Sequence, residues 1–133
     1  MTEVTAVIGR DRYKTELLAG SHLIIADEPL ADGGADLGPA PYQLLLSALG
    51  ACTVMTLRSY ADLKGLPVDR ITAELTMQVK DVDGKRHTYI NRHLIIEGDV
   101  EEKMLHRMTK IAEMCPVHRV LSSDIQIHTR LNN

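Results

Sequence analysis

The sequence contains two cysteines, Cys52 and Cys115, and their thiols are its strongest candidates for redox chemistry. When two thiols meet, one can be oxidised to a sulfenic acid and the other can condense with it to form a disulfide. The two residues stand too far apart in the chain for a CxxC redox motif or a zinc knuckle. Sequence spacing cannot bring them into contact, so their pairing is a hypothesis at this point.

Cys52 lies within an apolar run, residues 44–55, that is predicted to be helical. Its neighbours on the same helix face include Leu45, Leu49 and Thr56. A cysteine in such a place can serve simply as a small hydrophobic side chain. A chemical role for Cys52 therefore needs a partner elsewhere in the chain.

Cys115 directly precedes Pro116. Because proline is favoured in the first turn of a helix, Cys115 is predicted to end one helix and to cap the next. The unpaired N–H groups at the start of a helix stabilise a thiolate. This position favours a reactive sulfur.

His118 follows three residues after Cys115, and His106 precedes it on a predicted helix. Together these residues suggest a C-x-x-H metal corner, but a structural zinc site normally closes with four ligands. We therefore expect no metal here, and we interpret His118 as a capping residue or a local hydrogen-bond partner.

The cysteines are embedded in a pattern that predicts an α+β fold with antiparallel strand pairing. Alternating apolar and polar residues indicate strands, whereas apolar residues at helical spacing indicate helices. The predicted strands span residues 2–8, 12–18, 22–26, 68–79, 88–97 and 125–131, and the predicted helices span residues 41–64, 100–114 and 117–121.

Turn and cap residues set the limits of these elements. Pro41 suits the first turn of the long helix, and Gly65 suits the position just after its end. Asp83-Gly84 predicts a hairpin turn, and Asp99 predicts a cap for the helix that follows it. Because apolar residues fill the long helix up to Met55, we expect that part to be buried, and we expect residues 57–63 to be amphipathic.

Length and composition predict a single soluble domain over residues 1–133. The net charge is -3 and the chain has neither Trp nor Phe, so nucleic-acid binding is disfavoured. The N-terminus shows no secretory signal, and the apolar run is too short to span a membrane. We therefore expect a cytoplasmic protein that does not engage a membrane.

Two segments resemble the signatures of the OsmC/Ohr family, which comprises osmotically inducible protein C-like proteins and organic hydroperoxide resistance proteins. The first, residues 38–53, reads GPAPYQLLLSALGACT and contains Cys52. The second, residues 111–118, reads IAEMCPVH and contains Cys115. The loop at residues 27–34 also matches, so the resemblance covers essentially the whole chain and favours the OsmC-like subgroup.

The resemblance implies antiparallel sheets around a buried central helix that carries Cys52, in an intertwined homodimer with active sites at the interface. It also implies reduction of organic hydroperoxides, with Cys52 as the peroxidatic and Cys115 as the resolving cysteine. A small dithiol or a thiol-disulfide protein would then reduce the disulfide, and no cofactor would be needed.

The family also uses an arginine from the N-terminal strands to stabilise the thiolate, and Arg10 matches that motif best, with Arg12 as the competitor. In peroxidatic members a glutamate pairs with this arginine. Here the corresponding positions are Tyr42-Gln43, so Gln43 could orient the guanidinium only as a neutral acceptor. This departure leaves an alternative open: a catalytically weak OsmC-like protein that binds a small molecule or senses oxidants.

Overall fold

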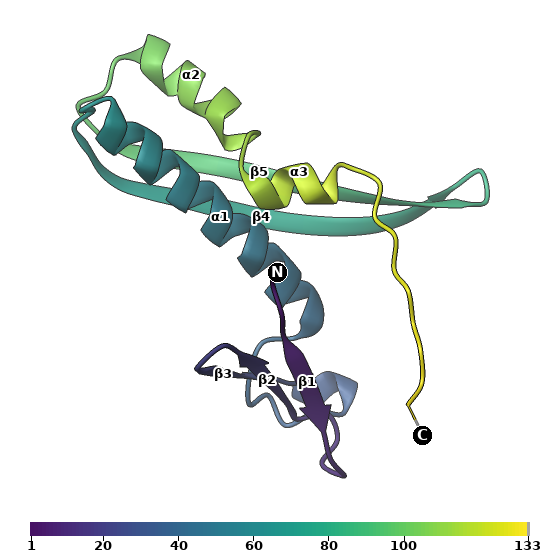
Figure 1. Ribbon diagram of the computed structural model, residues 1–133. Coiled ribbons are helices and arrows are strands. Elements are labelled where there is room, and N and C mark those ends of the chain that lie inside the picture. The colour runs from purple at the N-terminus through teal and green to yellow at the C-terminus, as the bar shows by residue number, and fades with distance from the viewer. Residues whose placement is uncertain (133) are drawn as a thin grey trace. The chain divides into compact units, whose positions relative to one another are not determined.

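The computed structural model describes residues 1–132. It divides into two compact units, Met1–Leu45 and Leu46–Asn133, and each unit is described by itself. Helices are combined with two antiparallel sheets, which confirms the predicted α+β class (Figure 1).

The N-terminal unit contains a three-stranded antiparallel sheet in the order β1-β2-β3. Its strands are β1 (Thr5–Ile8), β2 (Thr15–Ala19) and β3 (His22–Ala26). β3 has the predicted bounds, whereas β1 and β2 each begin three residues later than predicted. The 3-10 helix η1 (Leu30–Asp32), which the sequence did not predict, interrupts the loop that follows.

Two glycines of this loop allow close backbone approach. A Cβ atom on Gly34 would collide with the carbonyl of Glu28, and one on Gly38 would collide with the carbonyl of Ile25. The Gly- and Pro-rich composition of the loop is therefore a packing requirement as well as a source of turns.

The sheet of the C-terminal unit is one long hairpin of β4 (Val68–Val82) and β5 (Lys85–Gly98). Asp83 and Gly84 form its two-residue turn, and both have positive φ values, 52° and 76°. That combination is typical of the type I′ turn, whose twist matches the twist of the paired strands. The predicted turn is confirmed, and the strands are longer than predicted.

The long helix, α1 (Pro41–Leu63), begins and ends where the proline and glycine signals place it. Gly65 has a φ of 64°, and the N–H of Leu66 donates to the carbonyl of Ala61 at 2.9 Å. These bonds satisfy carbonyls that the helix end would otherwise leave unpaired.

Two shorter helices follow, α2 (Glu102–Ala112) and α3 (Pro116–Leu121). The prediction that Asp99 caps α2 is wrong, because the capping position is Glu101. The N–H of Val100 bonds back to the carbonyl of Gly98 at 3.0 Å, so the chain is still turning at Asp99 and the helix starts later.

The core of the C-terminal unit lies between the hairpin and the helices (Figure 1). It is built from the buried side chains of α1, β4 and α2, which are Leu57, Ala61, Val68, Met108 and Ala112. The residues of α1 in this set are four positions apart, so they lie on one helix face. That face contacts the core.

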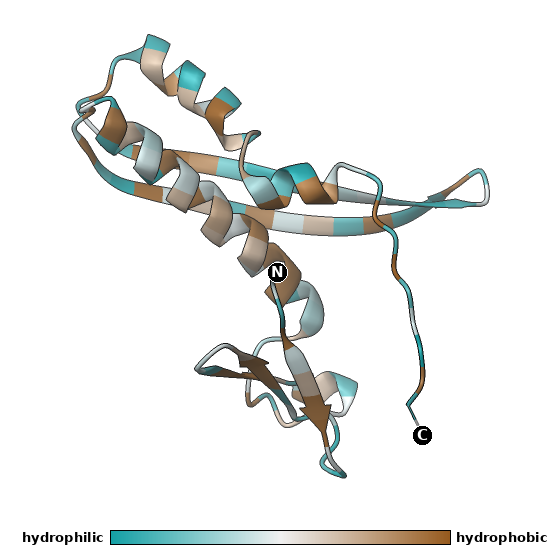
Figure 2. Cartoon of the chain, in the orientation of Figure 1, coloured by the Kyte–Doolittle hydropathy of each residue, from teal (hydrophilic) through white to brown (hydrophobic). Residues whose placement is uncertain are grey.

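The prediction that the first part of α1, up to Met55, is buried is wrong for the single chain. Five of its residues are buried, namely Leu49, Gly50, Thr53, Leu57 and Ala61. Other hydrophobic residues of α1 are exposed, including Met55 at 68% and Leu63 at 82%. Figure 2 shows the hydrophobic colour of much of the α1 ribbon. One chain covers one face of the helix and leaves hydrophobic side chains on the rest accessible.

The predicted strand at residues 125–131 does not form. Within the described chain this segment has no regular secondary structure, and the side chains of Ile127 and Leu131 are 85% and 84% exposed. The alternating pattern of this segment suits a strand, but a strand also needs a neighbour to pair with.

Candidate active site

The two cysteines lie together in the C-terminal unit. Cys52 belongs to α1, Cys115 lies between α2 and α3, and their side chains are about 3.4 Å apart. Both are free thiols. The proximity that the sequence could only suggest is therefore present in the fold.

Cys115 caps α3, as its position before Pro116 predicts. Its Sγ accepts the backbone N–H of His118 at 3.3 Å, and Pro116 occupies the first helical turn. The side chain of Cys115 is completely buried. It is a sulfur held by fixed donors rather than one open to solvent.

The surroundings of Cys115 lower the pKa of its thiol. Burial raises the pKa, but this effect is outweighed by donors that favour the thiolate. The donors are the N–H of His118, the thiol of Cys52, the hydroxyl of Thr53 and the N–H of Val117. A larger fraction of Cys115 is therefore ionised than in an ordinary cysteine.

Thr53 connects the thiol pair to a polar network. Its Oγ1 lies 3.9 Å from the Sγ of Cys115 and 2.7 Å from the carbonyl of Leu49, to which it donates. Because a hydroxyl has one hydrogen, it can serve either the carbonyl or a thiolate at a given moment. Thr53 can therefore respond to ionisation of Cys115 by rotating its O–H bond.

Arg92 supplies the positive charge of this network. Its Nη1 donates to Oγ1 of Thr53 and its Nη2 donates to Nδ1 of His118, both at 3.0 Å. Since a guanidinium can only donate, Nδ1 of His118 must accept, which places the proton of the neutral ring on Nε2. The network thus orients both a hydroxyl and an imidazole beside Cys115.

Arg92 was not predicted as a site residue, although the pattern of β5 indicates it. Ile90, Leu94 and Ile96 alternate along the half-buried side of the strand, and Arg92 occupies the position between them in the same register. An arginine at an inward-facing position of a strand is unusual, because a buried charge needs polar partners.

A cleft adjoins Cys52. It has a volume of about 730 Å³ and is referred to below as the Cys52 cleft. Its walls come from α1, α2 and the start of α3 and are mostly apolar: Ala48, Ala51, Cys52, Met55, Thr56, Ser59, Tyr60, Leu63, Ile111, Met114 and Pro116. Cys52 is partly exposed and is itself one of the lining residues.

A second, smaller cavity of about 200 Å³ adjoins Arg92 and is called the Arg92 cavity. It lies among β5, α3 and the early part of α1, and its lining residues are Leu49, Thr88, Ile90, Arg92, His118, Leu121 and Ser122.

A family model described as OsmC-like protein matches residues 33–130. The chain belongs to the OsmC-like family. The match contains both cysteines and the whole Arg92 network. The resemblance on which the sequence analysis relied is confirmed.

Solved structures share the fold. An OsmC-like protein from Mycoplasma pneumoniae is 24% identical, with a TM-score of 0.78. The match covers 91% of this chain and 86% of that chain. The organic hydroperoxide resistance protein OhrB of Bacillus subtilis is 20% identical, with a TM-score of 0.65 and coverages of 93% and 92%.

An organic hydroperoxide resistance protein OsmC from Legionella pneumophila is 19% identical, with a TM-score of 0.69 and coverages of 92% and 89%. No curated protein sequence matched. At these identities the structures establish a shared OsmC/Ohr fold.

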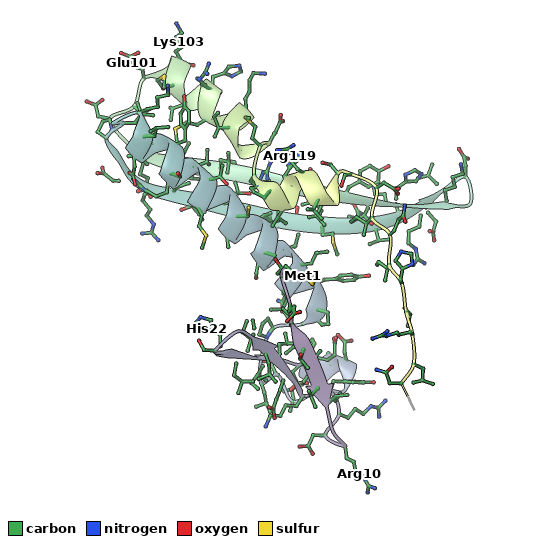
Figure 3. The ribbon with its side chains drawn as sticks, in the orientation of Figure 1. Met1, Arg10, His22, Glu101, Lys103 and Arg119 are labelled. Carbon is green, nitrogen blue, oxygen red and sulfur yellow. The ribbon has the colours of Figure 1, made fainter. Side chains whose placement is uncertain are left out.

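The two other site residues that the OsmC resemblance predicts lie in the N-terminal unit. Arg10 is exposed in the connection between β1 and β2, and Figure 3 shows its side chain directed away from the strands. Oε1 of Gln43 accepts the N–H of Ala40 at 2.9 Å, which helps to cap α1. The guanidinium of Arg12 lies over the ring of Tyr13, 5.0 Å from its centroid. Functional roles for Arg10 and Gln43 stay predictions.

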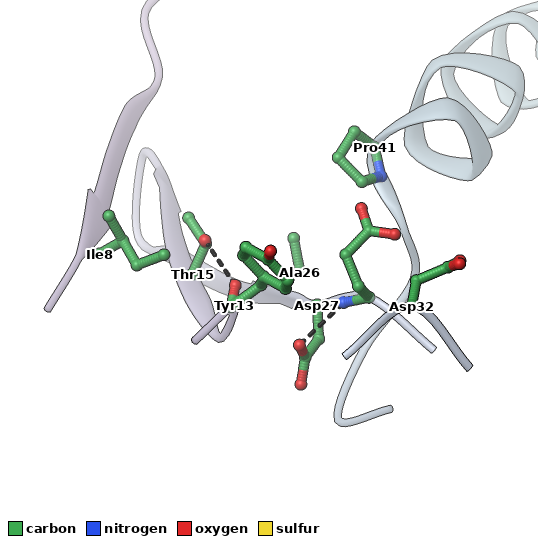
Figure 4. A pocket seen from close by; sticks show the side chains of 8 residues that line it. Ile8, Tyr13, Thr15, Ala26, Asp27, Asp32 and Pro41 are labelled. Carbon is green, nitrogen blue, oxygen red and sulfur yellow. Dashed lines mark hydrogen bonds between the residues drawn. The ribbon is translucent and has the colours of Figure 1, made fainter. Parts of the chain in front are cut away.

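The N-terminal unit of this OsmC-like chain has a cavity of its own, about 390 Å³ in volume, beside the buried carboxylate of Asp27 (Figure 4). The carboxylate accepts the N–H groups of Glu28 at 2.8 Å, Leu37 at 3.2 Å and Ala35 at 3.3 Å. Burial raises the pKa of Asp27, but these bonds outweigh it, so the pKa lies below its usual value. These three hydrogen bonds hold the loop between Asp27 and Leu37 in one conformation.

Helix α1 is long and apolar enough to cross a membrane by length and composition alone. The sequence analysis counted only residues 44–55, whereas the helix continues to Leu63. One such helix is weak evidence, because the core helix of a soluble protein passes the same test.

Proposed function

We propose that this protein is a thiol-dependent peroxidase that reduces organic hydroperoxides through a Cys52 sulfenic acid and a Cys52–Cys115 disulfide. The observation that carries the proposal is the pair of free thiols about 3.4 Å apart, one beside an apolar cleft and the other held by hydrogen-bond donors. Family membership and fold neighbours called organic hydroperoxide resistance proteins agree with this reaction.

The difference in exposure between the two thiols supports the roles proposed for them. Cys52 is partly exposed and lines the Cys52 cleft, whereas Cys115 is completely buried. A hydroperoxide must reach the sulfur that attacks it, so Cys52 is the peroxidatic residue. Cys115 needs to reach only the oxidised sulfur of Cys52, and its burial does not prevent that.

The acidity of Cys115 suits it to assist the first step. As a thiolate it accepts the proton of the neighbouring Cys52 thiol, which leaves Cys52 ionised. The Cys52 thiolate attacks the terminal peroxide oxygen, the O–O bond breaks, and the alkoxide that leaves takes the proton back from Cys115 to form the alcohol. Cys52 is now a sulfenic acid and Cys115 is again a thiolate.

The second step joins the two sulfurs. The Cys115 thiolate attacks the sulfur of the Cys52 sulfenic acid, and the hydroxide that leaves takes a proton from solvent to become water. A small dithiol or a thiol-disulfide protein then supplies two electrons and two protons, which restores both thiols. No cofactor takes part in these steps.

Two arginines are candidates for stabilising the negative charge. Arg92 contacts Thr53 and His118, which both hold Cys115, and this geometry supports a role in the reaction. Arg10 is proposed on the family resemblance alone. If both act, Arg10→Gln and Arg92→Gln will each slow peroxide consumption, and Arg86→Gln on the exposed part of β5 is the matched control.

The exposed hydrophobic face of α1 supports a further part of the proposal, an intertwined homodimer. Met55 and Leu63 are largely exposed in the single chain, and a second copy would remove such side chains from water. We also propose a cytoplasmic location, since a reducing compartment keeps such a thiol pair available for catalysis.

The test is peroxide consumption with cumene hydroperoxide as substrate and dithiothreitol as reductant. The parent protein is expected to consume the substrate catalytically, and Cys52→Ser is expected to be inactive while its circular dichroism spectrum stays unchanged. A Cys52→Ser protein that consumes the hydroperoxide as fast as the parent would overturn the proposal.

A second candidate function is an OsmC-like protein that binds a small molecule or senses oxidants with little turnover. The observation that favours it is Gln43, which replaces the glutamate of peroxidatic relatives and uses its Oε1 to bind the N–H of Ala40. In that case one equivalent of peroxide will oxidise the cysteines slowly and to mixed products, and added reductant will give no steady turnover.

A further inference from the structure

Arg92 is half-buried and, unlike the three arginines that form ion pairs, has no acidic partner among the described residues. Arg58, Arg70 and Arg86 each lie within ion-pair distance of a carboxylate on the exposed surface. Among residues 1–132, no carboxylate lies within 4.0 Å of Arg92, which contacts the neutral groups of Thr53 and His118. A half-buried guanidinium has lost part of its hydration and here gains no opposite charge in return.

Arg92 also keeps unused hydrogen-bond donors. A guanidinium has five N–H groups, and the bonds to Thr53 and His118 use two of them. These two bonds fix the plane of the guanidinium, because they hold Nη1 and Nη2 separately. The remaining N–H groups are therefore held in a set orientation without a protein acceptor among the described residues.

The Arg92 cavity provides space for such an acceptor. Its volume of about 200 Å³ is below the range of drug-sized ligand sites, so it suits a small molecule. Leu49, Ile90 and Leu121 give it apolar walls, and the hydroxyls of Thr88 and Ser122 add further polar groups. The cavity thus combines one fixed cation with a hydrophobic lining.

We propose that the Arg92 cavity binds a small organic carboxylate whose carboxylate pairs with Arg92 and whose hydrocarbon part contacts Leu49, Ile90 and Leu121. The planar guanidinium matches the geometry of a carboxylate and strengthens the bond through its charge. A free phosphate ion fits less well, because the apolar walls would gain nothing from it. The site is separate from the Cys52 cleft and its occupancy does not require peroxide chemistry.

Calorimetric titration of the reduced protein with hexanoate tests this proposal. Hexanoate is expected to bind, and 1-hexanol, which has the same chain but no charge, is expected to bind roughly tenfold more weakly or worse. Equal binding of the acid and the alcohol would overturn the ionic part of the proposal. Inorganic phosphate that binds as well as hexanoate would overturn the hydrophobic part, and no binding of hexanoate would overturn both.

Variants identify the site. Arg92→Gln is expected to lose hexanoate binding, and the matched control Arg86→Gln on the same strand is expected to retain it. Because Arg92 also holds Thr53 and His118, a second variant leaves it in place: Thr88→Phe puts an aromatic ring on an exposed strand position of the cavity wall. It is expected to weaken hexanoate binding, and unchanged binding in both variants would contradict the proposal.

These measurements are made without hydroperoxide, so they separate the two proposals. Hexanoate binding in a protein that consumes no cumene hydroperoxide would leave the cavity proposal standing and remove the peroxidase. If the protein consumes cumene hydroperoxide but does not bind hexanoate, the peroxidase proposal stands and the cavity proposal is overturned.

Discussion

Asp27 in the N-terminal unit and Cys115 in the C-terminal unit are two buried acidic groups whose pKa values are both lowered. Each would be harder to ionise because of burial, and each has a lowered pKa because backbone N–H groups and other donors outweigh that effect. Their surroundings differ in one respect. The oxygens of Asp27 accept N–H groups from its own loop, whereas Cys115 lies beside a second thiol.

The comparison shows that a lowered pKa is not enough to identify a reactive group. The carboxylate of Asp27 accepts the backbone N–H groups of Glu28, Ala35 and Leu37, so its charge stabilises the loop. Cys115 has a partner about 3.4 Å away that can be oxidised, and the partner adjoins an open cleft. A reactive partner and a route for substrate distinguish the second site from the first.

Of these two buried groups, Cys115 gives the larger expected effect on activity, when it is replaced by Ser. Without the resolving thiol, the Cys52 sulfenic acid cannot form the intramolecular disulfide, and steady turnover is expected to fall roughly 100-fold or more. The measurement is cumene hydroperoxide consumption with limiting dithiothreitol. The variant for comparison is Asp27→Asn, assayed at a temperature at which it is folded. It should consume cumene hydroperoxide at the rate of the parent protein. Equal loss of activity in both variants would contradict the claim that Cys115 is a reactive group and Asp27 is not.

Asp27→Asn is expected to act on stability instead. A neutral amide is a weaker acceptor for three backbone N–H groups, so the melting temperature is expected to fall by several degrees. The pKa of Asp27 is depressed by folding, so its contribution is fully present above about pH 4 and is lost as the pH falls through the folded-state pKa.

Melting temperatures between pH 7 and pH 3 will check this. The difference between the parent and Asp27→Asn should shrink on acidification, whereas Asp32→Asn, an exposed change in the same loop, should follow the parent throughout. A difference that stays constant or grows toward low pH would contradict the role given to the Asp27 carboxylate.

A smaller effect is expected from Thr53→Val, which removes one donor from the Cys115 thiolate. The pKa of Cys115 should rise, so disulfide formation at neutral pH should slow by about 2- to 10-fold and its pH profile should move to higher pH. Stopped-flow measurement of the step after peroxide addition will show this. Thr109→Val, which removes an exposed hydroxyl on α2, is the matched control and should leave the profile in place.

Local signals allowed much of the fold to be predicted. Pro41, Gly65 and Asp83-Gly84 each constrain a few neighbouring residues, and the structure has helix and turn limits at those points. The strand at residues 125–131 could not be judged in this way, because a strand exists only if another edge accepts its hydrogen bonds. The prediction that the first part of α1 is buried was wrong for the same reason, since burial depends on what the rest of the chain can cover.

The candidate site was predictable in part. Cys115 as a cap followed from its position before Pro116, whereas its contact with Cys52 depends on how α1 packs and could only be proposed. Arg92 and Thr53 were missed because each looked like an ordinary member of its element. Arg92 did carry a signal, since it stands at an inward position of β5 where the register otherwise places Ile90 and Leu94.

The most direct measurement is mass spectrometry of the protein under non-reducing conditions after one equivalent of cumene hydroperoxide. Rapid loss of two hydrogen atoms, with a peptide map that joins Cys52 to Cys115, is the expected result. A stable gain of oxygen on Cys52 while Cys115 remains a free thiol, or oxidation that leaves Cys52 unchanged, would contradict the claim that these two sulfurs act as one redox pair.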